Sequence, residues 1–186
     1  MKITLFISFI LSITTCFAQY DYDVSKTHPF GQPNPEAPEQ IKDFEPMIGL
    51  CKCKSTTRKQ DGKWNPSEDI IWKWKYIMNG TAVQDETLKP DGSHSGSIRQ
   101  FHKDSSKWYV HWFSAKTPLV KFPVWEGTKK EDKIILYKEH KAIDGTNGYY
   151  RLTFYDISDT GYKWVGEWVD TTEKIAYPTW KIECMR

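Results

Sequence analysis

The sequence lacks an excess of charge of either sign. Its 186 residues include 26 lysines and arginines against 24 aspartates and glutamates, which leaves a formal net charge of +2. A chain this close to neutral provides no long-range field for nucleic acid, and no basic cluster stands out in it. We therefore expect no nucleic-acid partner.

Long apolar runs are also missing. The longest, Ile3 to Ile13, is followed by Cys16 and Ala18 at the two small-residue positions that a signal peptidase reads. The run is too short to cross a bilayer, so residues 1–18 are predicted to be a secretory signal peptide, with no membrane span in the chain. The protein is therefore expected to be secreted or periplasmic. Acylation of Cys16, which would make it a lipoprotein, is the alternative.

Cysteine and histidine are scarce. After residue 18 the sequence has only Cys51, Cys53 and Cys184, of which one pair is expected to bridge in an oxidising compartment. The five histidines are too scattered for a metal triad, although a single haem-ligating histidine is an alternative. Nucleophile-elbow, phosphate-loop, zinc and kinase motifs are all absent from the sequence. We predict no metal and no cofactor, and the motifs leave catalysis open.

Aromatic residues are abundant, with nine tryptophans, ten tyrosines and nine phenylalanines. From Gly49 onward, about nine or ten short strand-like segments alternate with turn signals, and no long helical pattern occurs. This rhythm predicts an all-β fold over residues 41–186, either an antiparallel up-and-down barrel or a sandwich. Residues 19–40 read as an extended polar, proline-rich tether, and a short helix or turn at residues 40–48 is expected to plug one end.

The stretch from Ile70 to Glu86 predicts a hairpin. Its first half, through Met78, alternates between aromatic or apolar residues and lysines, and Asn79-Gly80 suits a type I′ turn. A two-residue turn sets the partners as Tyr76 with Val83, Trp74 with Asp85, and Lys73 with Glu86. Asp85 then shares a face with the tryptophans. It is either a buried acid with a partner or part of a binding site.

Closure of a barrel with an even number of strands makes the first and last strands antiparallel neighbours. Cys51 and Cys53 share one face of the first strand, and Cys184 lies on the last. We predict a Cys53–Cys184 disulfide, with Cys51 as the alternative partner of Cys184. A bridge between Cys51 and Cys53 is disfavoured, because residues i and i+2 of an extended strand are too far apart.

Two further hairpins bear on a possible site. A four-residue loop at residues 158–161 pairs Tyr155 with Trp164 and Arg151 with Trp168, which places Arg151 among aromatic side chains. There its guanidinium would stack on tryptophan or face a ligand. A loop of different length would send it to solvent. Between residues 97 and 115, Arg99 is predicted to pair with Val110, but the sequence does not decide which face points inward.

The order of these motifs resembles an uncharacterised group of lipocalin-like (calycin) barrels, which are secreted or periplasmic bacterial domains of unknown function. The resemblance covers about residues 41–186. It rests on Met47-Ile48-Gly49, Asn79 to Asp85, Ser97 to Phe101, Trp125-Glu126-Gly127 and Trp180 to Arg186. Calycins commonly open with Gly-x-Trp, whereas this chain has cysteine at the tryptophan position. The resemblance implies a barrel with a cavity and brings no agreed activity.

The leading hypothesis is a barrel that binds a small, partly apolar ligand. Its walls would be Trp72, Trp74 and Trp164, and its polar anchors Asp85 and Arg151. The alternatives are a barrel enzyme, either an isomerase or cyclase or a carboxylate-dependent hydrolase, and a glycan-binding surface of exposed tryptophans. The full set of candidate ligand-binding residues is Trp72, Trp74, Tyr76, Asp85, Arg99, Arg151, Trp164 and Trp168.

Overall fold

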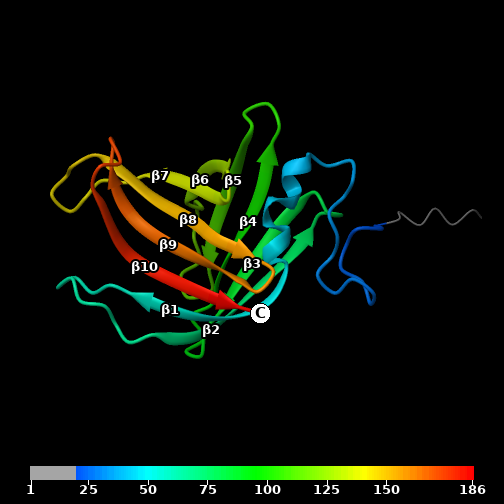
Figure 1. Ribbon diagram of the computed structural model, residues 1–186, viewed down its shortest axis with the longest axis horizontal. Coiled ribbons are helices and arrows are strands. Elements are labelled where there is room, and N and C mark those ends of the chain that lie inside the picture. Colours follow the sequence, from blue (N-terminus) through cyan, green and yellow to red (C-terminus); the bar gives the residue numbers. More distant parts are fainter. Residues whose placement is uncertain (1–19) are drawn as a thin grey trace, which may run out of the picture.

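The computed structural model describes residues 20–186, which form one antiparallel sheet of ten strands closed into a barrel (Figure 1). Consecutive strands are neighbours around the barrel, and β10 pairs with β1. The prediction of an all-β, up-and-down fold is confirmed, and of the two predicted architectures the structure has the barrel. The predicted signal peptide and Cys16 lie outside the described residues. Within residues 20–186, no helix has the length and apolar character needed to cross a membrane.

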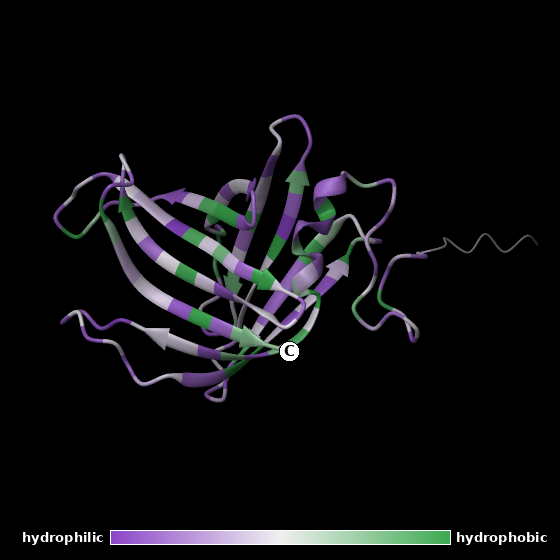
Figure 2. Ribbon diagram, viewed as in Figure 1, coloured by the Kyte–Doolittle hydropathy of each residue, from purple (hydrophilic) through white to green (hydrophobic). Residues whose placement is uncertain are grey.

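The strands are short and closely spaced. Their bounds are β1 (Gly49–Thr57), β2 (Glu68–Ile77), β3 (Ala82–Leu88), β4 (Ser95–His102), β5 (Lys107–Ser114), β6 (Val124–Lys130), β7 (Lys133–Glu139), β8 (Gly148–Ser158), β9 (Gly161–Asp170) and β10 (Ala176–Met185). Hydropathy alternates along β8, β9 and β10 (Figure 2), because successive side chains point into and out of the barrel.

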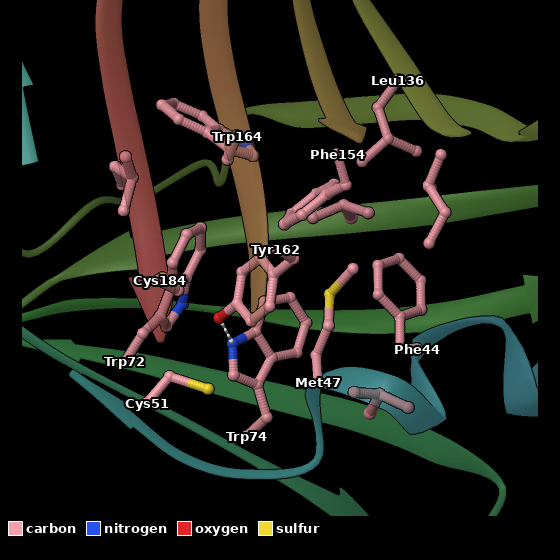
Figure 3. Close-up of a cluster of buried hydrophobic side chains, with 14 of the residues drawn as sticks. Phe44, Met47, Cys51, Trp72, Trp74, Leu136, Phe154, Tyr162, Trp164 and Cys184 are labelled. Atoms are coloured by element: carbon pink, nitrogen blue, oxygen red, sulfur yellow. Dashed lines mark hydrogen bonds between the residues drawn. The ribbon is translucent and has the colours of Figure 1, made fainter. Parts of the chain in front are cut away.

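A 3-10 helix, η1 (Glu39–Met47), plugs one end of the barrel, as the sequence predicted. It buries Ile41, Phe44 and Met47. The Phe44 ring stacks 5.6 Å from Trp74 and meets Trp108 edge-on at 4.9 Å, centroid to centroid. Figure 3 shows Phe44 and Met47 reaching from η1 into this aromatic cluster. Burial of large aromatic rings supplies most of the apolar area that stabilises this end.

The segment before η1 lies against the β2–β3 turn. The Tyr22 N–H donates to Asn79 Oδ1 at 3.0 Å, the Asn34 N–H donates to the Gly80 carbonyl at 3.1 Å, and the Tyr76 N–H donates to the Phe30 carbonyl at 2.8 Å. Residues 20–38 contain no helix or strand. Backbone hydrogen bonds to the turn therefore hold this extended segment in place.

The early hairpin has the predicted register. Tyr76 pairs with Val83, Trp74 with Asp85, and Lys73 with Glu86. The predicted two-residue turn is wrong, however, because β2 ends at Ile77 and β3 begins at Ala82, so residues 78–81 form the turn. Met78 has a positive φ of 54° and is 59% exposed, because the turn already begins there and rotates its side chain out of the barrel.

The barrel seam also follows the prediction. Cys53 lies opposite Cys184 in the β1–β10 register, and the two form a disulfide. Cys51 lies opposite Trp72 on β2 and is a buried free thiol. The bridge joins residues 131 positions apart, so it fastens the first strand of the barrel to the last.

The predicted register of the β8–β9 hairpin is wrong beyond its turn. The loop is shorter than predicted, because Ser158 and Gly161 pair with each other as strand residues. Further along, Tyr155 pairs with Lys163 and Arg151 with Glu167. The strand β8 has one extra residue between these pairs, a β-bulge that includes Asp156 at a φ of 51°. One extra residue sends every preceding side chain to the opposite face, so Arg151 lies outside the barrel.

Candidate ligand-binding cavity

A cavity of about 290 Å³ lies inside the barrel. Its lining includes the start of β4, the end of β5, the start of β6, the end of β7 and the start of β8, which meet at the barrel end opposite η1. The lining residues are Trp72, Asp85, Thr87, Ser95, Ser97, Arg99, Val110, Trp112, Pro123, Trp125, Lys138, Tyr150, Leu152, Trp164, Trp180 and Ile182. Most of this lining is apolar.

Asp85 and Arg99 form a buried ion pair on neighbouring strands β3 and β4. Asp85 is 3% exposed and Arg99 is 2% exposed. Arg99 Nη1 donates to Asp85 Oδ1, and Trp72 Nε1 donates to Asp85 Oδ2 at 2.7 Å. Both carboxylate oxygens are therefore occupied, which is how a buried charge is compensated away from water.

The guanidinium of Arg99 is also held by aromatic rings. Its Cζ lies 4.3 Å from the centroid of Trp74 and 5.1 Å from that of Phe44 on η1. Trp74 Nε1 in turn donates to the Tyr162 hydroxyl at 2.9 Å, the contact drawn as a dashed line in Figure 3. Burial raises the pKa of Tyr162 well above its usual value, so this hydroxyl stays protonated. The ion pair thus lies between the cavity and the aromatic core over η1.

The two predicted polar anchors, Asp85 and Arg151, do not lie together. Asp85 faces inward as the hairpin register required, but Arg99 is its partner. Arg151 lies on the outer face, where its Nη2 donates to Glu167 Oε1 at 2.9 Å and its Nη1 to Glu173. The bulge in β8 is the reason, because it reverses the facing of Arg151.

The remaining predicted site residues divide between the cavity and its surroundings. Trp72 and Trp164 line the cavity together with Asp85 and Arg99. Trp74 and Tyr76 are buried in the core toward η1 and are not lining residues. Trp168 is half-buried outside the lining, where its Nε1 donates to the His140 carbonyl at 3.1 Å.

Sequence reasoning missed four large lining residues, which are Trp112, Trp125, Lys138 and Tyr150. A signal for Lys138 was present. On β7, Ile134 and Leu136 are buried, and the same alternation continues to Lys138. A lysine on the inward face of a strand is unusual, and the period of two would have found it.

Lys138 is the one charged lining residue without an ion-pair partner in the part of the chain that the structure describes. Its Nζ lies 4.6 Å from the centroid of the Trp125 ring. Burial lowers the pKa of the Lys138 ammonium below its usual value. The Tyr150 hydroxyl is paired with Thr179 Oγ1 at 2.7 Å, and burial raises the pKa of Tyr150.

The cavity does not have the groups of a metal site. Across residues 20–186, His, Cys, Asp and Glu side chains nowhere gather in threes that could hold a metal ion. Histidine is also missing from the cavity lining. What the site offers is a wall of indole rings, a neutralised Asp85–Arg99 pair and one lysine.

The chain is similar in fold to the crystal structure of Rv2717c from M. tuberculosis. The TM-score is 0.50 with 7% sequence identity, over 81% of this chain and 99% of that one. At this level of identity the likeness shows the fold alone. No protein-family model matches the chain, and no curated protein matches it in sequence.

Proposed function

We propose that this protein binds a small, partly apolar ligand inside the barrel. The observation that carries the proposal is the cavity of about 290 Å³ between the aromatic core and the end opposite η1. Its volume lies at the lower end of the range of small-ligand sites, roughly 300–1,000 Å³. Trp72, Trp164 and Trp180 supply flat apolar surfaces, and a few polar groups are interspersed among them.

The binding proposal is favoured over catalysis by the state of Asp85. The Asp85 carboxylate is buried and is held by Arg99 and by Trp72, which is the arrangement of a structural ion pair. A glycan-binding face would need tryptophans exposed in a row. Trp72, Trp74, Trp108 and Trp164 are instead buried inside the barrel.

We also propose that the barrel is a lipocalin-like domain over residues 41–186, exported by a signal peptide at residues 1–18 and preceded by a tether at residues 19–40. The closed up-and-down topology supports the relationship to calycins. The Cys53–Cys184 disulfide is compatible with an oxidising compartment, and it supports a secreted or periplasmic location.

A matched pair of tryptophan substitutions tests ligand binding. Leu152 lines the cavity, and Thr153 follows it on the outward face of β8. Naphthamide, a neutral aromatic compound, serves as the probe ligand. Leu152→Trp is expected to fill part of the cavity and to weaken the binding of this probe about tenfold or more. Thr153→Trp should leave the binding unchanged. Isothermal titration calorimetry measures the affinity, and urea unfolding verifies that both variants are folded. Equal affinity of wild type and Leu152→Trp would reject the cavity as the binding site.

A further inference from the structure

The hydrogen-bonding groups of the cavity are unevenly divided between donors and acceptors. The strongest acceptor, the Asp85 carboxylate, already has both oxygens occupied. In contrast, Arg99 Nε and Trp125 Nε1 are buried N–H groups of lining residues that have no partner in the described part of the chain. Buried N–H groups are rarely left unpaired in proteins. The lining residues therefore include buried donors without a partner, whereas each oxygen of the only carboxylate among them already accepts a hydrogen bond.

The charge of the cavity also favours a ligand with an acceptor group. Asp85 and Arg99 neutralise each other, which leaves Lys138 as the one uncompensated charged side chain among the described lining residues. Its ammonium lies over the Trp125 ring, with no carboxylate within ion-pair distance. The partly buried Lys138 ammonium can pair with one anionic group placed beside it through a charge-assisted hydrogen bond.

The walls specify the rest of the ligand. Five indole rings line the cavity, those of Trp72, Trp112, Trp125, Trp164 and Trp180. Trp164 and Trp180 meet edge-to-face with centroids 5.2 Å apart. Such surfaces favour a flat ring system, which can take up offset-stacked or edge-to-face contacts. A cavity of about 290 Å³ suits a compact ring system better than a long acyl chain.

We propose that the ligand is a compact aromatic monocarboxylate whose carboxylate accepts a hydrogen bond from Lys138 Nζ while its ring lies against the indole rings that line the cavity. The proposal rests on the proposed function and names the ligand class for the same cavity. The carboxylate supplies the missing counter-charge of Lys138.

Two probes of one shape test the ligand class. Naphthoate and the neutral naphthamide share a ring system and differ in charge, and calorimetry measures both affinities on the full-length protein. Wild type is expected to prefer naphthoate about tenfold or more, a difference of about 1.4 kcal/mol. Lys138→Met should reduce the preference to about twofold or less, and Lys138→Arg should retain most of it. Lys133→Met, at an exposed position of the same strand, is the matched control.

The outcomes separate the two proposals. Equal binding of naphthoate and naphthamide to wild type would overturn the carboxylate assignment and leave ligand binding in the barrel intact. An undiminished preference in Lys138→Met would overturn the role of Lys138. Failure of both probes to bind wild type would overturn the proposed function and this inference together. The probe comparison on wild type needs no variant, so it holds even if a substitution impairs folding.

Discussion

Removing one partner of the buried Asp85–Arg99 ion pair should strongly destabilise the folded protein. The side chains are 4% and 3% exposed, so water cannot compensate a charge left alone. Asp85→Asn leaves the Arg99 guanidinium unpaired, and Arg99→Met leaves the carboxylate with only the Trp72 N–H. Breaking a buried ion pair in this way costs about 3–5 kcal/mol. We expect each single substitution to lower the free energy of unfolding by that amount.

The double variant should behave differently. Asp85→Asn combined with Arg99→Met removes both charges, and the introduced amide can still accept the Trp72 N–H. The combined loss is therefore expected to be no larger than either single loss, about 3 kcal/mol, which gives a coupling energy of about 3 kcal/mol. Urea unfolding followed by tryptophan fluorescence measures all four free energies, because the indoles surround the pair.

An exposed pair on the same hairpin is the matched control. Lys73 and Glu86 face each other on the outer side of β2 and β3, with Nζ and Oε2 3.2 Å apart and side chains 35% and 32% exposed. The cycle of Lys73→Met and Glu86→Gln should give a coupling below about 1 kcal/mol. Additivity of the buried pair within about 0.5 kcal/mol would refute the reasoning, since independent sites add to that accuracy.

Three further predictions follow from the barrel. Replacing Cys53 and Cys184 by alanine should lower the free energy of unfolding by up to about 5 kcal/mol, because the bridge spans 131 positions, and urea unfolding with and without reductant measures the loss. Burial raises the pKa of Tyr76 above the unfolded value of about 10, so its stabilisation is complete below pH 10 and is lost as pH rises further. Tyr76→Phe should flatten this alkaline loss in pH-dependent unfolding, and an unchanged loss would contradict the assignment. Gly127→Ala should prevent folding, because a Cβ there would lie 1.9 Å from a carbonyl oxygen of β7, whereas Gly92→Ala meets nothing within 4 Å and should cost only about 1–2 kcal/mol for its positive φ. Circular dichroism compares the two, and a folded Gly127→Ala protein would contradict the packing.

The sequence predicted well wherever a turn or the closure of the barrel left one register. The four-residue turn has the same centre, Asn79-Gly80, as the predicted two-residue turn, so the partners of Trp74 and Tyr76 still followed by counting. The seam followed in the same way, since a closed barrel with an even strand count brings the first strand beside the last. Cys184 then had only Cys51 and Cys53 within reach, and Cys53 is its partner.

The candidate site was less predictable, because a single inserted residue changes which side chains face inward. The position of the β8–β9 turn was predicted correctly but not its length, and the bulge at Asp156 moved Arg151 to the outer face. No pattern in the sequence marked that bulge. The inward face of β4 and β5 was also undecided, so Arg99 could be named as a candidate but not as the partner of Asp85.

By itself, the sequence determined the strand pattern, the early hairpin and the pair of strands that the disulfide joins. These depend on local turn geometry and on the two-residue period of a strand, which are properties of neighbouring residues. Only the tertiary structure decided that Arg99 meets Asp85 and that Lys138 faces the cavity without a counter-charge. The first depends on which faces of the neighbouring strands β3 and β4 point inward, and the second on which charged groups the other strands bring near Lys138.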